Sequence, residues 1–163
     1  MRSSPFVVLL GCSPGGPTAT TTQAPKAVEP VLAVAPAAPP APSGLAVATA
    51  QALELQLAQG EQLYVDTCAG CHGDAGEGTE DGPPVIGEGA LPIQPRPGAK
   101  REVTFRTAAD VYAFAREAMP ADDPGMLAAE QYLAIVAFDV RANGIGLARP
   151  LTAATAQLIV LHP

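Results

Sequence analysis

The chain has 163 residues, which is enough for one folded domain and additional segments. Aromatic residues make up only 4% of it and tryptophan is absent, so few large side chains are available to fill a core, and a bound apolar cofactor would help such a chain to pack. The net charge of −7 argues against a nucleic-acid partner and against a polybasic contact with a membrane.

Residues 1–12 are typical of a bacterial lipoprotein signal peptide. Arg2 supplies the positive charge, an apolar stretch follows, and Leu9-Leu10-Gly11-Cys12 resembles a lipobox, in which the cysteine becomes the lipidated N-terminus. The apolar stretch is shorter than the roughly 7–15 residues usual in such signals, and much shorter than the about 20 residues that span a bilayer. We therefore expect lipidation at Cys12 and a location on the periplasmic side of a bacterial membrane. The alternatives are a soluble periplasmic protein, if Cys12 is not lipidated, and an unprocessed N-terminus.

Residues 13–50 are predicted to form a disordered linker. They contain eight prolines and only two charged residues, Lys26 and Glu29. Such a Pro/Ala-rich composition favours extended, polyproline-like backbone without a hydrophobic period. At about 3.1 Å per residue, the segment could reach on the order of 100 Å. It would serve as a tether between a membrane and a domain, or as a spacer of no selected length.

Residues 51–146 show helical periodicity and are predicted to form the folded domain. One apolar face predicts a first helix, and its members are Leu53, Leu57, Gly60 and Tyr64. A second helix is expected from the N-cap Thr107 to Pro120, and a third from about Ala128 to Asn143-Gly144. No alternating run is long enough for a sheet. The Gly- and Pro-rich stretch 73–106 would be mostly loop, and residues 147–163 a C-terminal extension.

The run Cys68-Ala69-Gly70-Cys71-His72 is the attachment signature of c-type haem. Two thiols three positions apart can add to the two vinyl groups of one porphyrin, and the next residue, His72, then reaches the iron as a ligand. A redox Cys-x-x-Cys, a zinc site and chance are the alternatives. A zinc site usually needs four ligands, for which only His162 and Cys12 remain, and a thioredoxin-like site needs a βαβ pattern. The sequence therefore predicts one covalently bound haem c.

The second iron ligand is expected to be a methionine, since Met/His ligation is typical of electron-carrying cytochromes. Met119, 47 residues after His72 and next to Pro120, is the first candidate, and Met126 is the second. Either could instead be a methionine that fills a gap in the core. Without a methionine ligand the iron would have an open position, as in a gas sensor or a peroxidase.

Residues 51–146 resemble the class I monohaem cytochromes c, through the haem motif, Gly82-Pro83-Pro84-Val85, Met119-Pro120 and a closing amphipathic helix. The resemblance implies an all-α cytochrome c fold, with three to four helices and long loops around one haem. It also implies that the Pro83 carbonyl accepts a hydrogen bond from the free N–H of His72, which would tune the ligand. The first and last helices of the family cross at a glycine, which corresponds to Gly60 against Phe138 or Ile135.

The function expected from these features is single-electron transfer, not enzymatic catalysis, with the iron cycling between the ferric and ferrous states. Its partners would be a dehydrogenase, an oxidase or another cytochrome, and an acidic loop could steer a basic docking face towards it. The stretch 105–110, followed by Met119-Pro120 and the tail 151–161, is similar to haem domains that accompany periplasmic dehydrogenases. The alternative is therefore the electron-accepting subunit of such a complex. One basic residue could also pair with a haem propionate, the candidates being Arg96, Lys100, Arg101 and Arg106.

Overall fold

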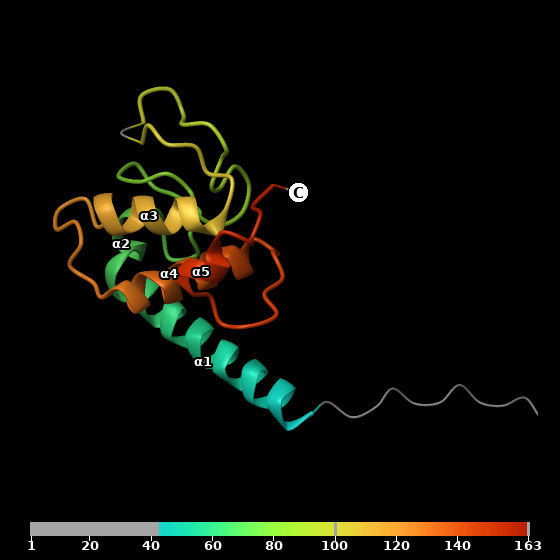
Figure 1. Cartoon of the computed structure of the whole chain (residues 1–163). Coiled ribbons are helices and arrows are strands. Elements are labelled where there is room, and N and C mark those ends of the chain that lie inside the picture. Colours follow the sequence, from blue (N-terminus) through green and yellow to red (C-terminus); the bar gives the residue numbers. More distant parts are fainter. Residues whose placement is uncertain (1–42, 100, 163) are drawn as a thin grey trace, which may run out of the picture. The chain divides into compact units, whose positions relative to one another are not determined.

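The computed structural model describes residues 43–99 and 101–162, and five helices lie within these ranges (Figure 1). They are α1 Gly44–Thr67, α2 Ala69–His72, α3 Ala108–Ala118, α4 Ala129–Ala142 and α5 Ala153–Ala156. The described residues form no strand, and only an isolated bridge joins Thr107 to Val160. The all-α class predicted from the sequence is therefore confirmed. The predicted signal peptide with Cys12, the linker up to residue 42, and Lys100 lie outside the described residues.

Helix α1 begins earlier than the predicted domain boundary at Gln51. The Ser43 side chain caps it by accepting a hydrogen bond from the backbone N–H of Ala46 at 3.4 Å. No proline occurs between Pro42 and Pro83, and the residues after Ser43 are largely good helix formers, so nothing stops the helix from starting at the cap. Residues 44–50, expected in the linker, thus form the first turns of α1.

Helix α3 begins at the predicted cap, Thr107. The Asp110 carboxylate accepts hydrogen bonds from the backbone N–H groups of Arg106 (2.9 Å) and Thr107 (2.8 Å) and from the Thr107 hydroxyl (3.0 Å). Partial burial alone would raise the pKa of Asp110, but these hydrogen bonds and the charge of Arg106 lower it overall. The helix ends at Ala118, directly before Met119.

Helices α1 and α4 cross at Gly60, as the resemblance implied. A Cβ atom at Gly60 would lie 2.6 Å from the carbonyl carbon of Ala134, closer still to its oxygen, and 3.0 Å from the Cβ of Phe138. Phe138 is thus one predicted partner, but the other is the Ala134 backbone and not Ile135. One turn along α1, the Tyr64 and Phe138 rings pack with centroids 5.6 Å apart. Only glycine allows the two helices to approach this closely.

The C-terminal extension packs on the domain and contributes to its core. Buried residues from this segment join the core cluster, namely Leu147, Leu151, Ala156 and Leu161. The Gln56 side chain accepts from the backbone N–H of Leu151 at 2.6 Å and donates to its carbonyl at 2.8 Å. Backbone hydrogen bonds from Ala108 to Ile159 (2.9 Å) and from Leu161 to Arg106 (3.0 Å) attach the last residues to the start of α3.

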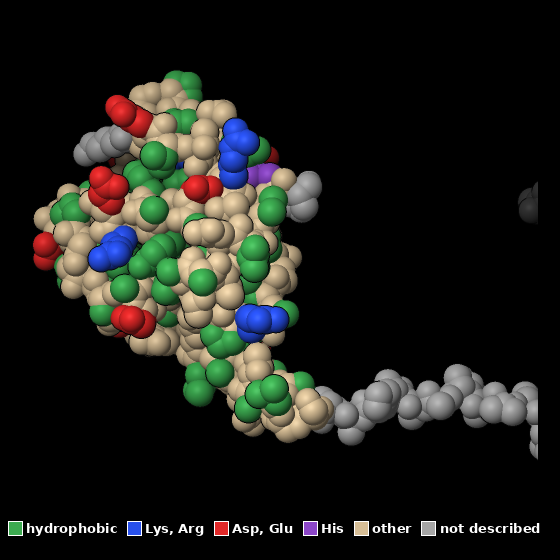
Figure 2. All heavy atoms as spheres, viewed as in Figure 1, with side chains coloured by type: hydrophobic (Ala, Val, Ile, Leu, Met, Phe, Trp, Pro, Cys, Tyr) green, Lys and Arg blue, Asp and Glu red, His purple; other side chains and the backbone are tan. Residues whose placement is uncertain are grey.

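The N-terminal half of α1 extends beyond the other helices (Figure 1). Leu45 and Leu55 are 80% and 73% exposed, and Figure 2 shows apolar side chains along this end of the helix. In the part of the chain that the structure describes, no helix combines the length and apolar character needed to cross a membrane.

Candidate functional site

The Cys-x-x-Cys-His run forms a single helical turn at the end of α1. Cys68 donates its backbone N–H to the Tyr64 carbonyl (2.8 Å), and His72 donates its own to the Cys68 carbonyl (2.9 Å). In a helix, side chains three positions apart share a face, so this turn brings the thiols of Cys68 and Cys71 to the same side. Cys68 is half-buried and Cys71 is exposed.

His72 is oriented by a hydrogen bond to the loop that follows it. Its Nδ1 atom lies 2.7 Å from the carbonyl oxygen of Pro83. With the proton on Nδ1, the ring donates to this carbonyl and the Nε2 atom remains free as a ligand nitrogen. A Cβ at Gly82 would lie 2.8 Å from the Cys71 carbonyl oxygen and 3.1 Å from the His72 Nδ1 atom, so glycine is what lets Pro83 come this close. Pro83 thus lies where the resemblance placed it.

Three further hydrogen bonds hold the loop against the motif. The buried Tyr64 hydroxyl donates to the Gly73 carbonyl at 2.7 Å, the Gly78 N–H to the His72 carbonyl at 2.7 Å, and the Thr79 hydroxyl to the Cys71 carbonyl at 2.6 Å. Gly73 ends α2 in the left-handed region, with φ at +87°. Sequence reasoning missed the contribution of Thr79, because nothing in a Gly-rich loop marks which hydroxyl folds back.

Met119 follows the last residue of α3, and its backbone is fixed from both sides. Its N–H donates to the Ala115 carbonyl at 2.9 Å, and its carbonyl accepts from the buried Tyr132 hydroxyl at 2.6 Å. Its side chain is half-buried, whereas Met126 is 55% exposed. The comparison favours Met119 over Met126 as the candidate ligand. Tyr132 was not singled out from the sequence, although a tyrosine on the apolar face of a predicted helix was the available signal.

The thiol of Cys68 is not that of a reactive redox cysteine. Burial first, and then the negative charges of Asp139 and Cys71, raise its pKa to about 12. A catalytic Cys-x-x-Cys instead lowers the pKa of its attacking thiol. Among residues 43–99 and 101–162, no three side chains of His, Cys, Asp or Glu lie close enough together to hold a metal ion. The geometry therefore gives no support to the redox and zinc alternatives.

Arg101, one of the candidate propionate partners, uses its guanidinium in contacts within the protein. Its guanidinium donates to the carbonyls of Pro92 (2.8 Å) and Val103 (2.6 Å) and lies 3.8 Å from the centre of the Phe105 ring. Burial first, and then the charge of Arg96, lower the pKa of Arg101. These contacts give it a structural role in the loop that precedes α3.

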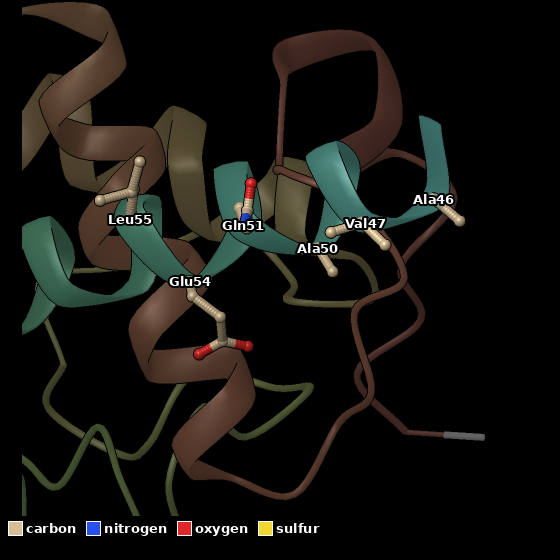
Figure 3. Close-up of a pocket in the computed structure, with 6 residues that line it drawn as sticks. All are labelled: Ala46, Val47, Ala50, Gln51, Glu54 and Leu55. Atoms are coloured by element: carbon tan, nitrogen blue, oxygen red, sulfur yellow. The ribbon is translucent and has the colours of Figure 1, made fainter. Parts of the chain in front are cut away.

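The shallow pocket in Figure 3 is separate from this site. Its six residues all belong to α1 and are Ala46, Val47, Ala50, Gln51, Glu54 and Leu55. At 1.5 Å per residue, even its nearest member lies about 20 Å along the helix from Cys68. It is lined mainly by apolar atoms and brings no group of polar side chains together.

Residues 55–138 match the family model described as cytochrome c oxidase, cbb3-type, subunit III. Among solved structures, the chain is similar to the crystal structure of the sulfane dehydrogenase SoxCD from Paracoccus pantotrophus, at 30% identity and a TM-score of 0.51. The similarity covers 65% of this chain and 53% of that one, so the chain spans about half of that chain's length. None of the curated proteins matches it. The family match contains the residues that the geometry brings to the motif, including Pro83, and it also contains the candidate ligand Met119.

Proposed function

Because the chain belongs to the c-type cytochrome family described as cytochrome c oxidase, cbb3-type, subunit III, we propose that it carries single electrons on one haem c that is bound through Cys68 and Cys71. The cytochrome domain makes it an electron-transfer protein and not an enzyme, and it implies haem c. The observation that carries the finer proposal is the 2.7 Å contact between the His72 Nδ1 atom and the Pro83 carbonyl. It gives the imidazole the orientation and the free Nε2 atom that an iron ligand needs.

The donor set of this chain fits haem c. The two thiols on one face of a turn would form the thioethers, and His72 and Met119 are proposed as the iron ligands. When bound, the haem would supply an iron that alternates between the ferric and ferrous states. The hydrogen bond to Pro83 would make His72 a more basic ligand, and a thioether ligand from Met119 would raise the potential.

The visible spectrum of the protein, produced in bacteria that mature c-type cytochromes, tests this proposal. We expect a covalent haem and a ferric methionine-to-iron charge-transfer band. Met119→Ala should abolish the band, while the matched variant Met126→Ala should keep it, because Met126 is 55% exposed. A band that survives in Met119→Ala and disappears in Met126→Ala would exchange the two assignments. Rapid CO binding to the ferrous wild-type protein would indicate an open iron position, as in a sensor or a peroxidase.

A second candidate function is the electron-accepting subunit of a periplasmic dehydrogenase complex. The similarity to the SoxCD sulfane dehydrogenase structure favours it. The chemistry at the haem would be the same, but the partner would be permanent. Mild purification from native membranes distinguishes the two: a carrier elutes alone, whereas a subunit elutes with its dehydrogenase in a fixed ratio.

We further propose that the protein works on the periplasmic side of a bacterial membrane, anchored by lipid on Cys12. The lipobox-like residues up to Cys12 and the proline-rich residues after it support this proposal, and two or more acyl chains give firm anchoring where one does not. Cys12→Ser should release the cytochrome from the membrane fraction into the soluble periplasm. If the variant stays in the membrane fraction, another interaction holds the protein there.

A further inference from the structure

Asp139 is a buried carboxyl group that the packing of the domain does not require. It lies on α4 with 6% of its surface exposed, and its Oδ1 atom has no hydrogen-bond partner among the described residues. The nearby Asn143 amide bonds the backbone carbonyl of Asp139 at 2.8 Å, so it does not need this side chain. Burying a carboxyl without a partner costs free energy, and an apolar residue of similar size would avoid that cost. The position therefore calls for a role beyond stability.

The face of α4 that carries Asp139 leads to the candidate ligand Met119. Tyr132 precedes Asp139 by seven residues, two helical turns, so the two side chains share one face. The Tyr132 hydroxyl holds the Met119 carbonyl at 2.6 Å. One end of this buried face is thus fixed to the residue proposed as the second iron ligand.

The same face also meets the residues that lead into the haem motif. Gly60 and Tyr64 on α1 and Cys68 at its C-cap follow one another at intervals of four, on one side of the helix. The first two contact α4 at Ala134 and Phe138. The negative charge of Asp139 also contributes to raising the pKa of both Tyr64 and Cys68. Asp139 therefore lies within electrostatic reach of the first haem-attachment cysteine.

This inference rests on the proposed function. We propose that Asp139 is a proton acceptor coupled to electron transfer at the haem site. When a redox partner delivers one electron, the Asp139 carboxylate takes up one proton from the solvent, and it releases that proton when the electron leaves. The electron and the proton balance in charge, and no bond other than the O–H bond of the carboxyl forms or breaks. The buried site therefore does not hold an ionised carboxylate and an added electron at the same time.

The chemistry of Asp139 suits this exchange near neutral pH. Burial raises its pKa to about 8, and no charged neighbour contributes to that shift. The groups that face it from α1 do not titrate in the same window: burial and Asp139 raise the pKa of Tyr64, and the thioether would consume the Cys68 thiol. The other charged groups on the packed elements are Glu54, Glu61 and Asp66 on α1, Asp74 and Glu77 in the loop, Asp110, Arg116 and Glu117 on α3, and Glu130 and Arg141 on α4.

Potentiometric titration of the complete haem protein between pH 5 and pH 9 tests the proposal. In the wild type, the reduction equilibrium constant should fall as the pH rises, by at most tenfold per pH unit, which is 59 mV for a one-electron couple. Asp139→Asn should remove this dependence in the same window. The matched variant Asp66→Asn removes an exposed carboxylate from α1 and should titrate like the wild type.

A second measurement, which needs only the wild type, tests the proposal even if Asp139→Asn does not fold. Redox-difference infrared spectra of the wild type should show a protonated carboxyl band that grows on reduction. A potential that does not change with pH, a dependence that Asp139→Asn retains, or the absence of that band would each overturn the proposal. A protein that binds no haem, or that shows no reversible reduction, would instead overturn the proposed function.

Discussion

The crossing of α1 and α4 at Gly60 yields a strong prediction about stability. In Gly60→Ala the new Cβ would lie 2.6 Å from the carbonyl carbon of Ala134, whereas carbon atoms pack best at about 3.5–4.0 Å, so the helices must separate by roughly 1 Å. Both atoms are fixed to backbone, and no side-chain rotation can relieve the clash. Overpacking of this kind costs about 1–3 kcal/mol, and alanine regains up to about 1 kcal/mol of helix propensity. We expect a net loss of about 2 kcal/mol.

Urea unfolding, followed by the helical circular dichroism signal, measures this loss. Gly44→Ala is the matched control, because a Cβ there meets no atom within 4 Å. It should leave stability unchanged or raise it by less than about 1 kcal/mol. If Gly60→Ala unfolds at the same urea concentration as the wild type, with the same slope, the close approach of the two helices is not what the glycine provides.

Three further variants test other contacts by the same unfolding assay. Asn143→Ala should cost about 2 kcal/mol, because its side chain donates to the Val85 carbonyl (2.8 Å) and accepts from the Gly87 N–H (3.0 Å); a loss below 0.5 kcal/mol, on the order of a single weak hydrogen bond, would contradict this. Asp110→Ala should cost about 1 kcal/mol at neutral pH. Because hydrogen bonding lowers the pKa of Asp110, the wild type should lose this contribution only as the pH falls through that lowered pKa, and the variant should show no such loss. Between the usual pKa of 3.8 and the folded pKa of about 8, the wild type should lose stability as the pH rises, because the unfolded Asp139 ionises while the folded one does not. Asp139→Asn removes this loss, so it should become more stable relative to the wild type across this range. At pH 7 the wild type should carry a penalty of about 4 kcal/mol relative to acidic pH, and parallel pH profiles for the two proteins would refute it.

The sequence predicts those parts of the fold that local rules determine. Thr107 caps α3 and Asn143 ends α4 as expected, because caps depend on residues within one turn. The Cys-x-x-Cys-His turn follows from its own spacing. The start of α1 was placed too late, because the alanine-rich composition continues across Ser43 and only the change in proline content marks the cap.

Long-range contacts could not be predicted in the same way. Gln56 and Leu151 are 95 positions apart, and the C-terminal extension has no period that indicates which surface it covers. Asp139 shows the limit most clearly. A charged residue in a helix normally indicates the solvent face, but eight residues of α4 are buried, so its burial follows from neighbours on several sides and not from its own pattern.

These contacts together make α4 the element that positions the site. Near its start, Tyr132 holds the Met119 carbonyl (2.6 Å), and at its end, the Asn143 side chain holds the loop at Val85, close to Pro83. The same helix packs closely against α1 at Gly60, about two helical turns before the haem motif. Both proposed ligands are therefore connected to α4. Met119 is held through its own carbonyl, and His72 is held through the loop that contains Pro83 and Val85. If haem binds as proposed, such a framework would keep the proposed ligands in place while the charge of the iron changes, so that little reorganisation would be needed when an electron arrives or leaves.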